Sequence, residues 1–280
     1  MIPDKVDPEK IVVVPTRYGR MMVLANDRYM GAALIRHGEY SESEVALWRQ
    51  LIPAHAIVAD IGANVGAHTV ALASLVPLGE VHAFEPLPFM YRMMVGNVAL
   101  NGLTNVRHYP IAVGAEAGSI TIPPLDYTQD SNYGGMAIEG HAFGNPVPVF
   151  RLDDVLKVCH FLKVDVEGME LAVLKGAERI IRECRPGLYL ENNPGPDQDT
   201  LIRYVQGLGY DVWWHYAPHF NPDNVNGAEA LDDHEKTVVS YNILCLPHSP
   251  DNQIEGLPFV PPLENSPPPP DENPENGEGV

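Results

Sequence analysis

From residue 57 onward, short apolar runs alternate with longer stretches in which apolar residues recur at helical spacing. The short runs predict buried strands and the longer stretches predict helices. The predicted strands are 57–61, 81–84, 106–113, 161–166, 187–190, 210–215 and 238–246. The predicted helices are 67–75, 88–100, 152–158, 170–182 and 199–208. This alternation is typical of an α/β fold whose mostly parallel sheet is covered by helices on both faces.

Two connections between the predicted elements differ from this alternation. The last two strands are expected to pair antiparallel, because no helix-length pattern separates them. A small hairpin is expected at 119–122. The following stretch, 123–148, is rich in Gly, Pro, Asn and Tyr, and it predicts a long loop of the kind that often serves as a lid.

The first 55 residues precede the alternation and are expected to cover one edge of the main domain. Short strands are predicted at 11–14 and 20–24. Ser41 and Glu44 have the spacing of a capping box, so a helix is predicted to begin there with Ser41 as its N-cap.

The C-terminal segment 249–280 has a different composition. It contains nine prolines and seven carboxylates but no Lys or Arg, which predicts a disordered, acidic tail. The predicted organisation is an N-terminal edge segment (1–55), a main domain (56–248) and this tail (249–280).

The formal net charge of −19 argues against nucleic acid or an anionic membrane as a partner. No apolar run has the length that a membrane-spanning helix needs. The cysteines Cys159, Cys184 and Cys245 are scattered and odd in number, so no disulfide framework is expected and a cytoplasmic setting fits best.

The strongest chemical signal lies at 57–69, where an apolar strand leads into Asp60 and then into two glycines that flank Asn64. Glycines admit close backbone approach, and a helix N-terminus follows, so this turn predicts a nucleotide-type cradle. Dinucleotide sites prefer G-x-G-x-x-G, which Asn64 interrupts, and the Gly-Lys-Ser/Thr ending of a P-loop is absent. An adenosyl sulfonium cofactor has no phosphate. It needs one carboxylate near its ammonium and another at its ribose, which Asp60 and Glu85 would supply.

Acidic residues also follow other predicted strands. Asp60, Glu85, Asp165 and Glu191 all lie at or just past strand ends. In a parallel sheet these ends meet at one edge, where ligands bind. Asp165 or Glu167 is expected to accept the proton of an attacking hydroxyl, which requires a raised carboxyl pKa. The alternative is that Glu167 only caps the following helix.

Two further groups of polar residues are candidates for an acceptor site. Asn132, in the predicted lid, is expected to fold over adenine or substrate. His215, His219, Asn221 and Asn224 follow the sixth strand and either line an acceptor site, with His215 as an alternative base, or form a simple turn. A divalent metal held by Asp165, Glu191 and His215 is conceivable but not favoured, because no ligand spacing supports it.

Taken together, these motifs resemble the FkbM family of S-adenosylmethionine-dependent methyltransferases. The matching segments are 60–69, 84–88, 162–170, 173–177, 185–186, 191–192, 215–224 and 240–242. The resemblance implies a Rossmann-like class I fold with a seven-stranded sheet, S-adenosylmethionine as cofactor, and O-methylation of a sugar or polyketide-type hydroxyl. The residues expected at the cofactor are Asp60, Gly62, Ala63, Asn64, Gly66, Thr69, Glu85, Pro86 and Asp165. Those expected at the substrate are Asn132, Glu191, Asn221 and Asn224.

Two other functions remain open at this point. A nicotinamide oxidoreductase is disfavoured by Asn64 and by the lack of a Ser/Tyr-Lys catalytic spacing. A non-catalytic scaffold, with the proline-rich tail recruiting a partner, is disfavoured because buried acids that serve no purpose are costly.

Overall fold

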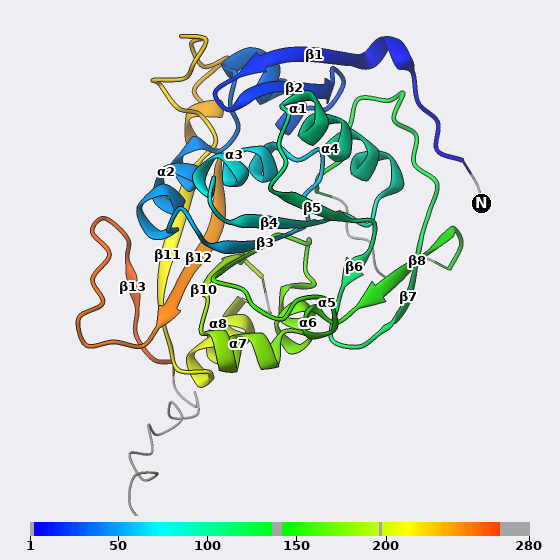
Figure 1. Ribbon diagram of the computed structural model, residues 1–280. Helices are drawn as coiled ribbons and strands as arrows, with labels where there is room; N and C mark the ends of the chain where they lie inside the picture. Colours follow the sequence, from blue (N-terminus) through cyan, green and yellow to red (C-terminus); the bar gives the residue numbers. More distant parts are fainter. Residues whose placement is uncertain (1–2, 136–141, 196–197, 264–280) are drawn as a thin grey trace, which may run out of the picture.

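The computed structural model describes residues 3–135, 142–195 and 198–263 of the 280-residue chain (Figure 1). Its centre is an eight-stranded sheet in the order β13-β11-β12-β10-β9-β3-β4-β5. Five strands are parallel: β3 (Ile57–Ile61), β4 (Glu80–Phe84), β5 (Val106–Tyr109), β9 (Phe161–Val164) and β10 (Gly187–Glu191). Three more extend the sheet in antiparallel pairings: β11 (Tyr210–Pro218), β12 (Val239–Pro247) and β13 (Phe259–Val260). The predicted mostly parallel α/β fold and the antiparallel last pair are confirmed.

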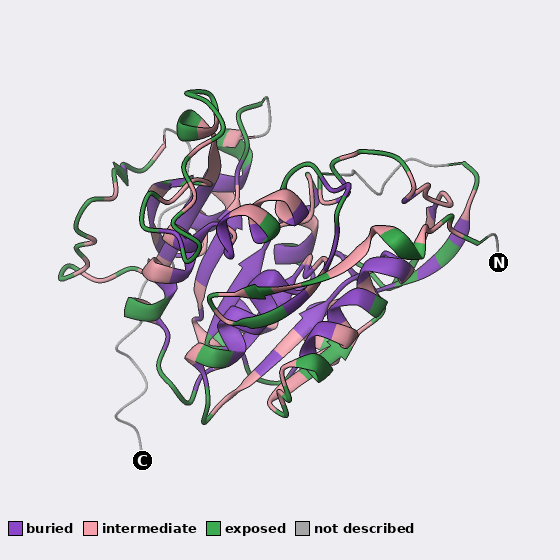
Figure 2. Ribbon diagram, turned by 90° about the horizontal axis from the view of Figure 1, so that it is seen from above, coloured by how far each residue is buried: buried purple, intermediate pink, exposed green. Residues whose placement is uncertain are grey.

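Helices cover both faces of this sheet (Figure 1). On one face lie α2 (Glu42–Leu51), α3 (Ala67–Leu75) and α4 (Pro88–Leu100), and on the other lie α5 (Leu152–Val155), α6 (Glu170–Lys175), α7 (Glu178–Cys184) and α8 (Gln198–Gly207). Figure 2 shows the buried residues concentrated on the sheet and on the helix faces that turn toward it. Within the described residues no helix is both long enough and apolar enough to cross a membrane.

The N-terminal segment contains a short 3₁₀ helix η1 (Pro8–Lys10), a hairpin of β1 (Ile11–Thr16) and β2 (Gly19–Leu24), and α1 (Met30–His37). The hairpin is anchored to α4 by Asn97, whose Oδ1 accepts from the Met22 amide at 2.6 Å and whose Nδ2 donates to the Met22 carbonyl at 2.9 Å. This segment therefore packs on the helical layer.

Two predicted elements are divided in the structure. The strand expected at 106–113 ends at Tyr109, and β6 (Ala112–Val113) joins another sheet, because Pro110 has no N–H with which to continue the ladder. The helix expected at 170–182 breaks into α6 and α7 at Gly176. A Cβ there would lie 2.0 Å from the Gly114 carbonyl oxygen, so the chain turns where two backbones touch.

The expected long loop is shorter than predicted. Strand β7 (Gly118–Ile122) pairs antiparallel with β8 (Asn145–Phe150), and β6 completes this three-stranded sheet. Residues 145–148 were predicted as part of the loop, but they pair with β7, and their side chains are alternately buried and exposed, as in a strand. Residues 136–141 of the predicted lid lie outside the described residues.

The tail was expected to be disordered from residue 249, which is wrong for its first part. Strand β13 pairs with β11 through Val212–Val260 and Trp213–Phe259, and Val260 is buried. Hydrogen bonds from Ser249 and Asn252 to Asp211, and from Gln206 to the carbonyls of Val260 and Pro261, also hold this stretch against the sheet. Residues 264–280 of the predicted tail lie outside the described residues.

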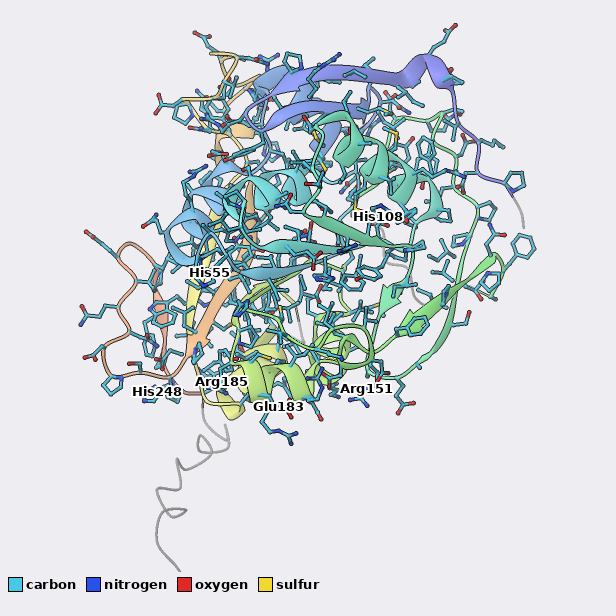
Figure 3. All side chains as sticks on the ribbon, viewed as in Figure 1. His55, His108, Arg151, Glu183, Arg185 and His248 are labelled. Atoms are coloured by element: carbon cyan, nitrogen blue, oxygen red, sulfur yellow. The ribbon has the colours of Figure 1, made fainter. Side chains whose placement is uncertain are left out.

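The turn between α8 and β11 is held from a neighbouring helix. Arg185, which follows α7 with a φ of 49°, donates hydrogen bonds to the carbonyls of Leu208 and Gly209, both at 2.6 Å (Figure 3). Its guanidinium lies 4.3 Å from the centre of the Tyr210 ring. A last 3₁₀ helix, η2 (Glu235–Thr237), precedes β12.

Candidate active site

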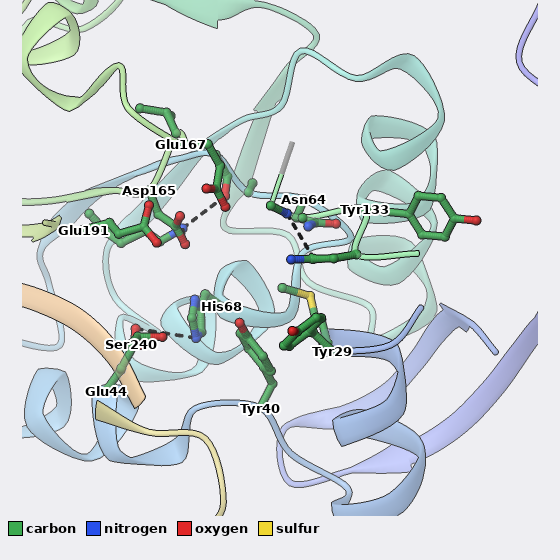
Figure 4. A pocket seen from close by; sticks show the side chains of 18 of the residues that line it. Tyr29, Tyr40, Glu44, Asn64, His68, Tyr133, Asp165, Glu167, Glu191 and Ser240 are labelled. Carbon is green, nitrogen blue, oxygen red and sulfur yellow. Dashed lines mark hydrogen bonds and ion pairs between the residues drawn. The ribbon is translucent and has the colours of Figure 1, made fainter. Parts of the chain in front are cut away.

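A cavity of about 390 Å³ opens at the carboxyl ends of β3, β4, β9 and β10 (Figure 4). This is the edge at which ligands bind in open α/β sheets. Its walls come from the strand ends, from β12 and from the N-terminal segment. The lining residues that matter below are Tyr29, Tyr40, Glu44, Gly62, Ala63, Asn64, His68, Glu85, Pro86, Asn132, Lys163, Asp165, Glu167, Glu191, His219, Ser240 and Asn242.

The glycine turn after β3 forms one end of the cavity. Gly62 has a φ of 82°, and a Cβ on it would lie 1.8 Å from the Asp165 carbonyl oxygen, so only glycine lets the turn approach the end of β9. Asn64 also adopts a left-handed conformation (φ 52°), which asparagine tolerates better than most residues. A Cβ on Gly134 would lie 2.8 Å from the side-chain nitrogen of Asn64, so the segment that carries Asn132 lies close against this end of the cavity.

Glu85, just past β4, lies beside this turn. Its Oε2 accepts a hydrogen bond from the Asn64 amide and its Oε1 accepts one from the Leu87 amide, both at 2.7 Å. Burial raises the pKa of Glu85 to about 7 despite these bonds. The carboxyl therefore fixes the shape of the turn while it lines the cavity, and each oxygen keeps a lone pair for a ligand.

Asp60, expected at the cofactor, is not among the residues that line the cavity and lies behind its wall. It is fully buried, accepts from the Thr69 hydroxyl at 2.6 Å and pairs with Lys163 at 3.1 Å. Gly66 and Thr69 are likewise not among the lining residues. These three predicted cofactor residues support the wall from behind.

Lys163 lies between the buried layer and the cavity. Its ammonium is 3.5 Å from Asp165 Oδ2 and donates to the Gly62 carbonyl at 3.0 Å. Burial alone would lower the pKa of Lys163, but the Asp60 and Asp165 carboxylates raise it, so the side chain stays charged. Among the described residues that line the cavity, it is the one ammonium or guanidinium group.

Three carboxylates meet where β9 and β10 end, close to the glycine turn. Asp165 and Glu191 are two of the four acids expected at this edge, and Glu167 joins them. Asp165, Glu167 and Glu191 each place an oxygen within 4.8 Å of the others. Burial and the neighbouring Asp165 charge raise the pKa of Glu167 to about 7, and the same causes raise the pKa of Glu191. Hard divalent cations bind such carboxylate sets.

The suggestion that Glu167 merely caps a helix is not supported, because the N-cap of α6 is Met169 and no side-chain capping bond is formed there. Glu170 Oε1 accepts from the amides of Val166 and Gly168 at 3.1 and 3.2 Å. Glu167 itself has a φ of 54°, which is unusual for a residue with a long side chain, and its carboxyl lines the cavity. Such strain often accompanies a functional position.

Three residues expected at the acceptor lie elsewhere. His215 belongs to β11, where its Nδ1 shares a hydrogen bond of 2.8 Å with the Tyr189 hydroxyl, and burial lowers its pKa to about 4. It is not among the lining residues and does not belong to the carboxylate cluster, so the described geometry gives no support to its expected roles as alternative base and metal ligand. Asn221 donates to Glu39 at 2.7 Å, and Asn224 bridges the backbone of its own loop. Both stabilise a turn.

Several lining residues were not singled out from the sequence. The N-terminal segment contributes Tyr29, Tyr40 and Glu44, which makes it part of the wall as well as an edge cover. Lys163 carried a usable signal, because a charged residue within an apolar strand needs a buried partner. Ser240 and Asn242, which come from β12, belong to the 240–242 segment that matched the family, but the sequence pattern predicts no role for them at the site.

Known proteins resemble this chain in sequence. The model of the methyltransferase FkbM domain matches residues 60–212, more than half of the chain. The chain belongs to the FkbM methyltransferase family. It is 29% identical over 196 residues to methyltransferase sdnD of Sordaria araneosa, covering 58% of this chain and 76% of that protein. It is 28% identical over 149 residues to methyltransferase 1 of Beauveria bassiana, covering 45% of this chain and 60% of that one.

Among solved structures, an FkbM methyltransferase from Methylobacillus flagellatus matches with a TM-score of 0.49 and 17% identity, covering 69% of this chain and 44% of that chain. The Rossmann-like methyltransferase fold expected from the motifs is confirmed, with β13 as an eighth strand. Family membership identifies the protein as a methyltransferase, so the oxidoreductase and scaffold hypotheses fall away.

The family implies S-adenosylmethionine (SAM) as methyl donor, and the described residues fit it. Gly62, Ala63 and Asn64 offer a close backbone approach, and Glu85 offers a carboxylate at the end of β4. The surplus of carboxylates over the single ammonium of Lys163 suits a cationic ligand better than a phosphorylated one.

Proposed function

We propose that this FkbM methyltransferase transfers the methyl group of SAM to a hydroxyl of a small molecule, a sugar or a polyketide-type acceptor. The observation that carries this proposal is the carboxylate cluster of Asp165, Glu167 and Glu191, which lines the cavity where β9 and β10 end. A hydroxyl loses its proton as it is methylated, and a carboxylate of raised pKa is suited to take it. SAM supplies the reactive methyl group, and the protein aligns the acceptor and excludes water.

Within the cluster, Glu167 is the proposed base, and Asp165 orients the hydroxyl. Lys163 lies 3.5 Å from Asp165, so that carboxylate is already held in an ion pair with a protein cation. Glu167 forms no ion pair that the structure records for the described residues, and its pKa of about 7 lies near the pH at which a base works best.

A small molecule is favoured over nucleic acid by charge. Glu44, Glu85, Asp165, Glu167 and Glu191 all line the cavity, and they would repel a phosphate backbone. The net charge of −19 acts in the same direction over the whole surface.

The test is transfer of a labelled methyl group from SAM to a panel of glycosides, phenols, polyketide-type alcohols, amines, tRNA and rRNA. Label on the hydroxylated small molecules is the expected result, and label only on amines or RNA would overturn the proposal. Glu167→Gln should lower kcat by about 10²–10⁴-fold. It should leave the affinity for S-adenosylhomocysteine (SAH), the demethylated product, nearly unchanged in calorimetry.

The matched control is Glu183→Gln, which removes an exposed carboxylate on α7 that pairs with Arg179 and should leave kcat unchanged. If Glu167→Gln keeps wild-type turnover, the base lies elsewhere in the cluster.

A further inference from the structure

Helix α2 begins with the sequence of a capping box, yet Glu44 does not cap it. In a capping box the Ser side chain bonds the N3 amide, and the Glu side chain returns to the N-cap amide. Here Ser41 has a left-handed φ of 45°, its hydroxyl makes no capping bond, and the Glu44 amide donates to the Ser41 carbonyl at 3.0 Å instead. The Glu44 carboxyl lines the cavity (Figure 4). The expected capping box is therefore absent.

Glu44 is buried, with 5% of the residue exposed, and the hydrogen bond recorded for its carboxyl among the described residues involves one oxygen. Oε1 accepts from Asn242 Nδ2 at 3.2 Å. The nitrogen recorded nearest to Oε2 is His68 Nε2 at 3.9 Å, too far for a hydrogen bond, and burial keeps that imidazole neutral by lowering its pKa to about 3. Across the described residues, no donor within hydrogen-bond range of Oε2 is recorded. Oε2 therefore faces the cavity with its lone pairs free for a ligand group.

The protonation state of Glu44 limits which chemical group of a ligand can bond Oε2. Burial and the Asp165 charge raise the pKa of Glu44 to about 8, so both the acid and the carboxylate are populated near neutral pH. The acid form offers a donor at Oε2, and the ionised form offers only an acceptor. An ammonium satisfies only the ionised form and a carbonyl only the acid form, whereas a hydroxyl satisfies both.

We propose that Glu44 binds a second hydroxyl group of the methyl acceptor, so that the acceptor is a diol or polyol rather than an isolated alcohol or phenol. This rests on the proposed function, in which the first hydroxyl faces Glu167. The neighbouring wall is equally polar, since His219 and Ser240 share a hydrogen bond of 2.8 Å there. The N-terminal segment thus supplies acceptor recognition, and the strand ends supply the chemistry.

The first test uses matched acceptors: methyl glucoside against its monodeoxy counterparts, and catechol against phenol, with labelled SAM. The wild type should favour the member with the extra hydroxyl, by kcat/KM. Glu44→Ala should lower kcat/KM for that member by about 10- to 100-fold and leave its deoxygenated partner nearly unchanged. A wild type that methylates mono-ols equally well, or that methylates no member of the panel, overturns the diol assignment.

The control is Glu42→Gln. Glu42 is also buried and lies on the same helix, but it bonds Tyr18 at 2.7 Å and pairs with Arg49 at 3.3 Å, outside the cavity. It should retain the wild-type preference. Equal loss of preference in both variants would show a structural effect of α2 and overturn the role of Glu44.

A second measurement needs no acceptor. The sulfonium of SAM lowers the pKa of facing carboxyls and SAH does not, so SAM binding should release more protons than SAH binding in calorimetry with two buffers. Glu44→Gln should reduce this difference, and Glu42→Gln should not. An unchanged difference in Glu44→Gln would show that the carboxyl does not face the ligand. Methylation confined to amines or RNA would instead overturn the proposed function, with the calorimetric result for Glu44 still standing.

Discussion

Lys163 is a buried cation that forms ion pairs with two carboxylates, and replacing it tests the electrostatic interpretation of the site. Its ammonium lies 3.1 Å from Asp60 and 3.5 Å from Asp165, and the side chains of Lys163 and Asp60 are 4% and 0% exposed. Lys163→Met keeps most of the side-chain volume but leaves Asp60 as a buried charge without a counterion. The Thr69 hydroxyl bond to Asp60 remains and compensates only part of the loss.

The expected cost follows from the burial. Removing one partner of a buried ion pair costs about 3–5 kcal/mol, whereas losing an exposed pair costs about 1 kcal/mol or less. For a chain of this size, each kcal/mol lowers Tm by about 2–4 °C. Asp60 is fully buried, so we expect the larger value, and Lys163→Met should lower Tm by roughly 6–20 °C.

The assay is urea unfolding followed by tryptophan fluorescence. Lys175→Met, which removes an exposed lysine on α6, is the control and should change the unfolding free energy by less than about 0.5 kcal/mol. Adding Asp60→Asn to Lys163→Met should recover at least half of the lost stability, because it removes the uncompensated charge. A cost below about 1 kcal/mol for Lys163→Met, or no recovery in the double variant, would refute this reasoning.

Three further expectations follow from the site. Glu85→Ala should weaken SAH binding at least about 10-fold in calorimetry, because the turn amides lose their acceptor and the ligand loses a carboxylate. Gly62→Ala should unfold at much lower urea than Gly102→Ala. Both have positive φ, but only the Gly62 Cβ meets a backbone oxygen, that of Asp165 at 1.8 Å, while Gly102 has open space and should lose about 1–2 kcal/mol. Glu44→Gln should raise Tm more at about pH 8.5 than at about pH 5.5: a carboxyl whose folded pKa is raised to about 8 destabilises the fold increasingly as pH rises from its unfolded value. An equal gain at both pH values would show that Glu44 does not titrate there.

The local patterns of the sequence determined the strand–helix alternation, the turn at Gly62 and the meeting of Glu85, Asp165 and Glu191 at one edge. Apolar periodicity sets which segments are strands, and parallel topology brings the carboxyl ends of those strands together whatever the loops do. These features depend only on the short-range sequence pattern and on the direction of the chain, so they can be predicted without knowing which distant segments touch.

Only the tertiary structure decided which polar side chains reach the cavity. His215 was expected there, but β11 continues to Pro218, so this histidine lies within the strand and bonds Tyr189. Glu44 has the spacing of a helix cap and faces the cavity instead, and Asp60 supports the wall from behind. Whether a polar residue faces a ligand or the protein depends on which distant segment packs against it, and neither spacing nor composition records that contact.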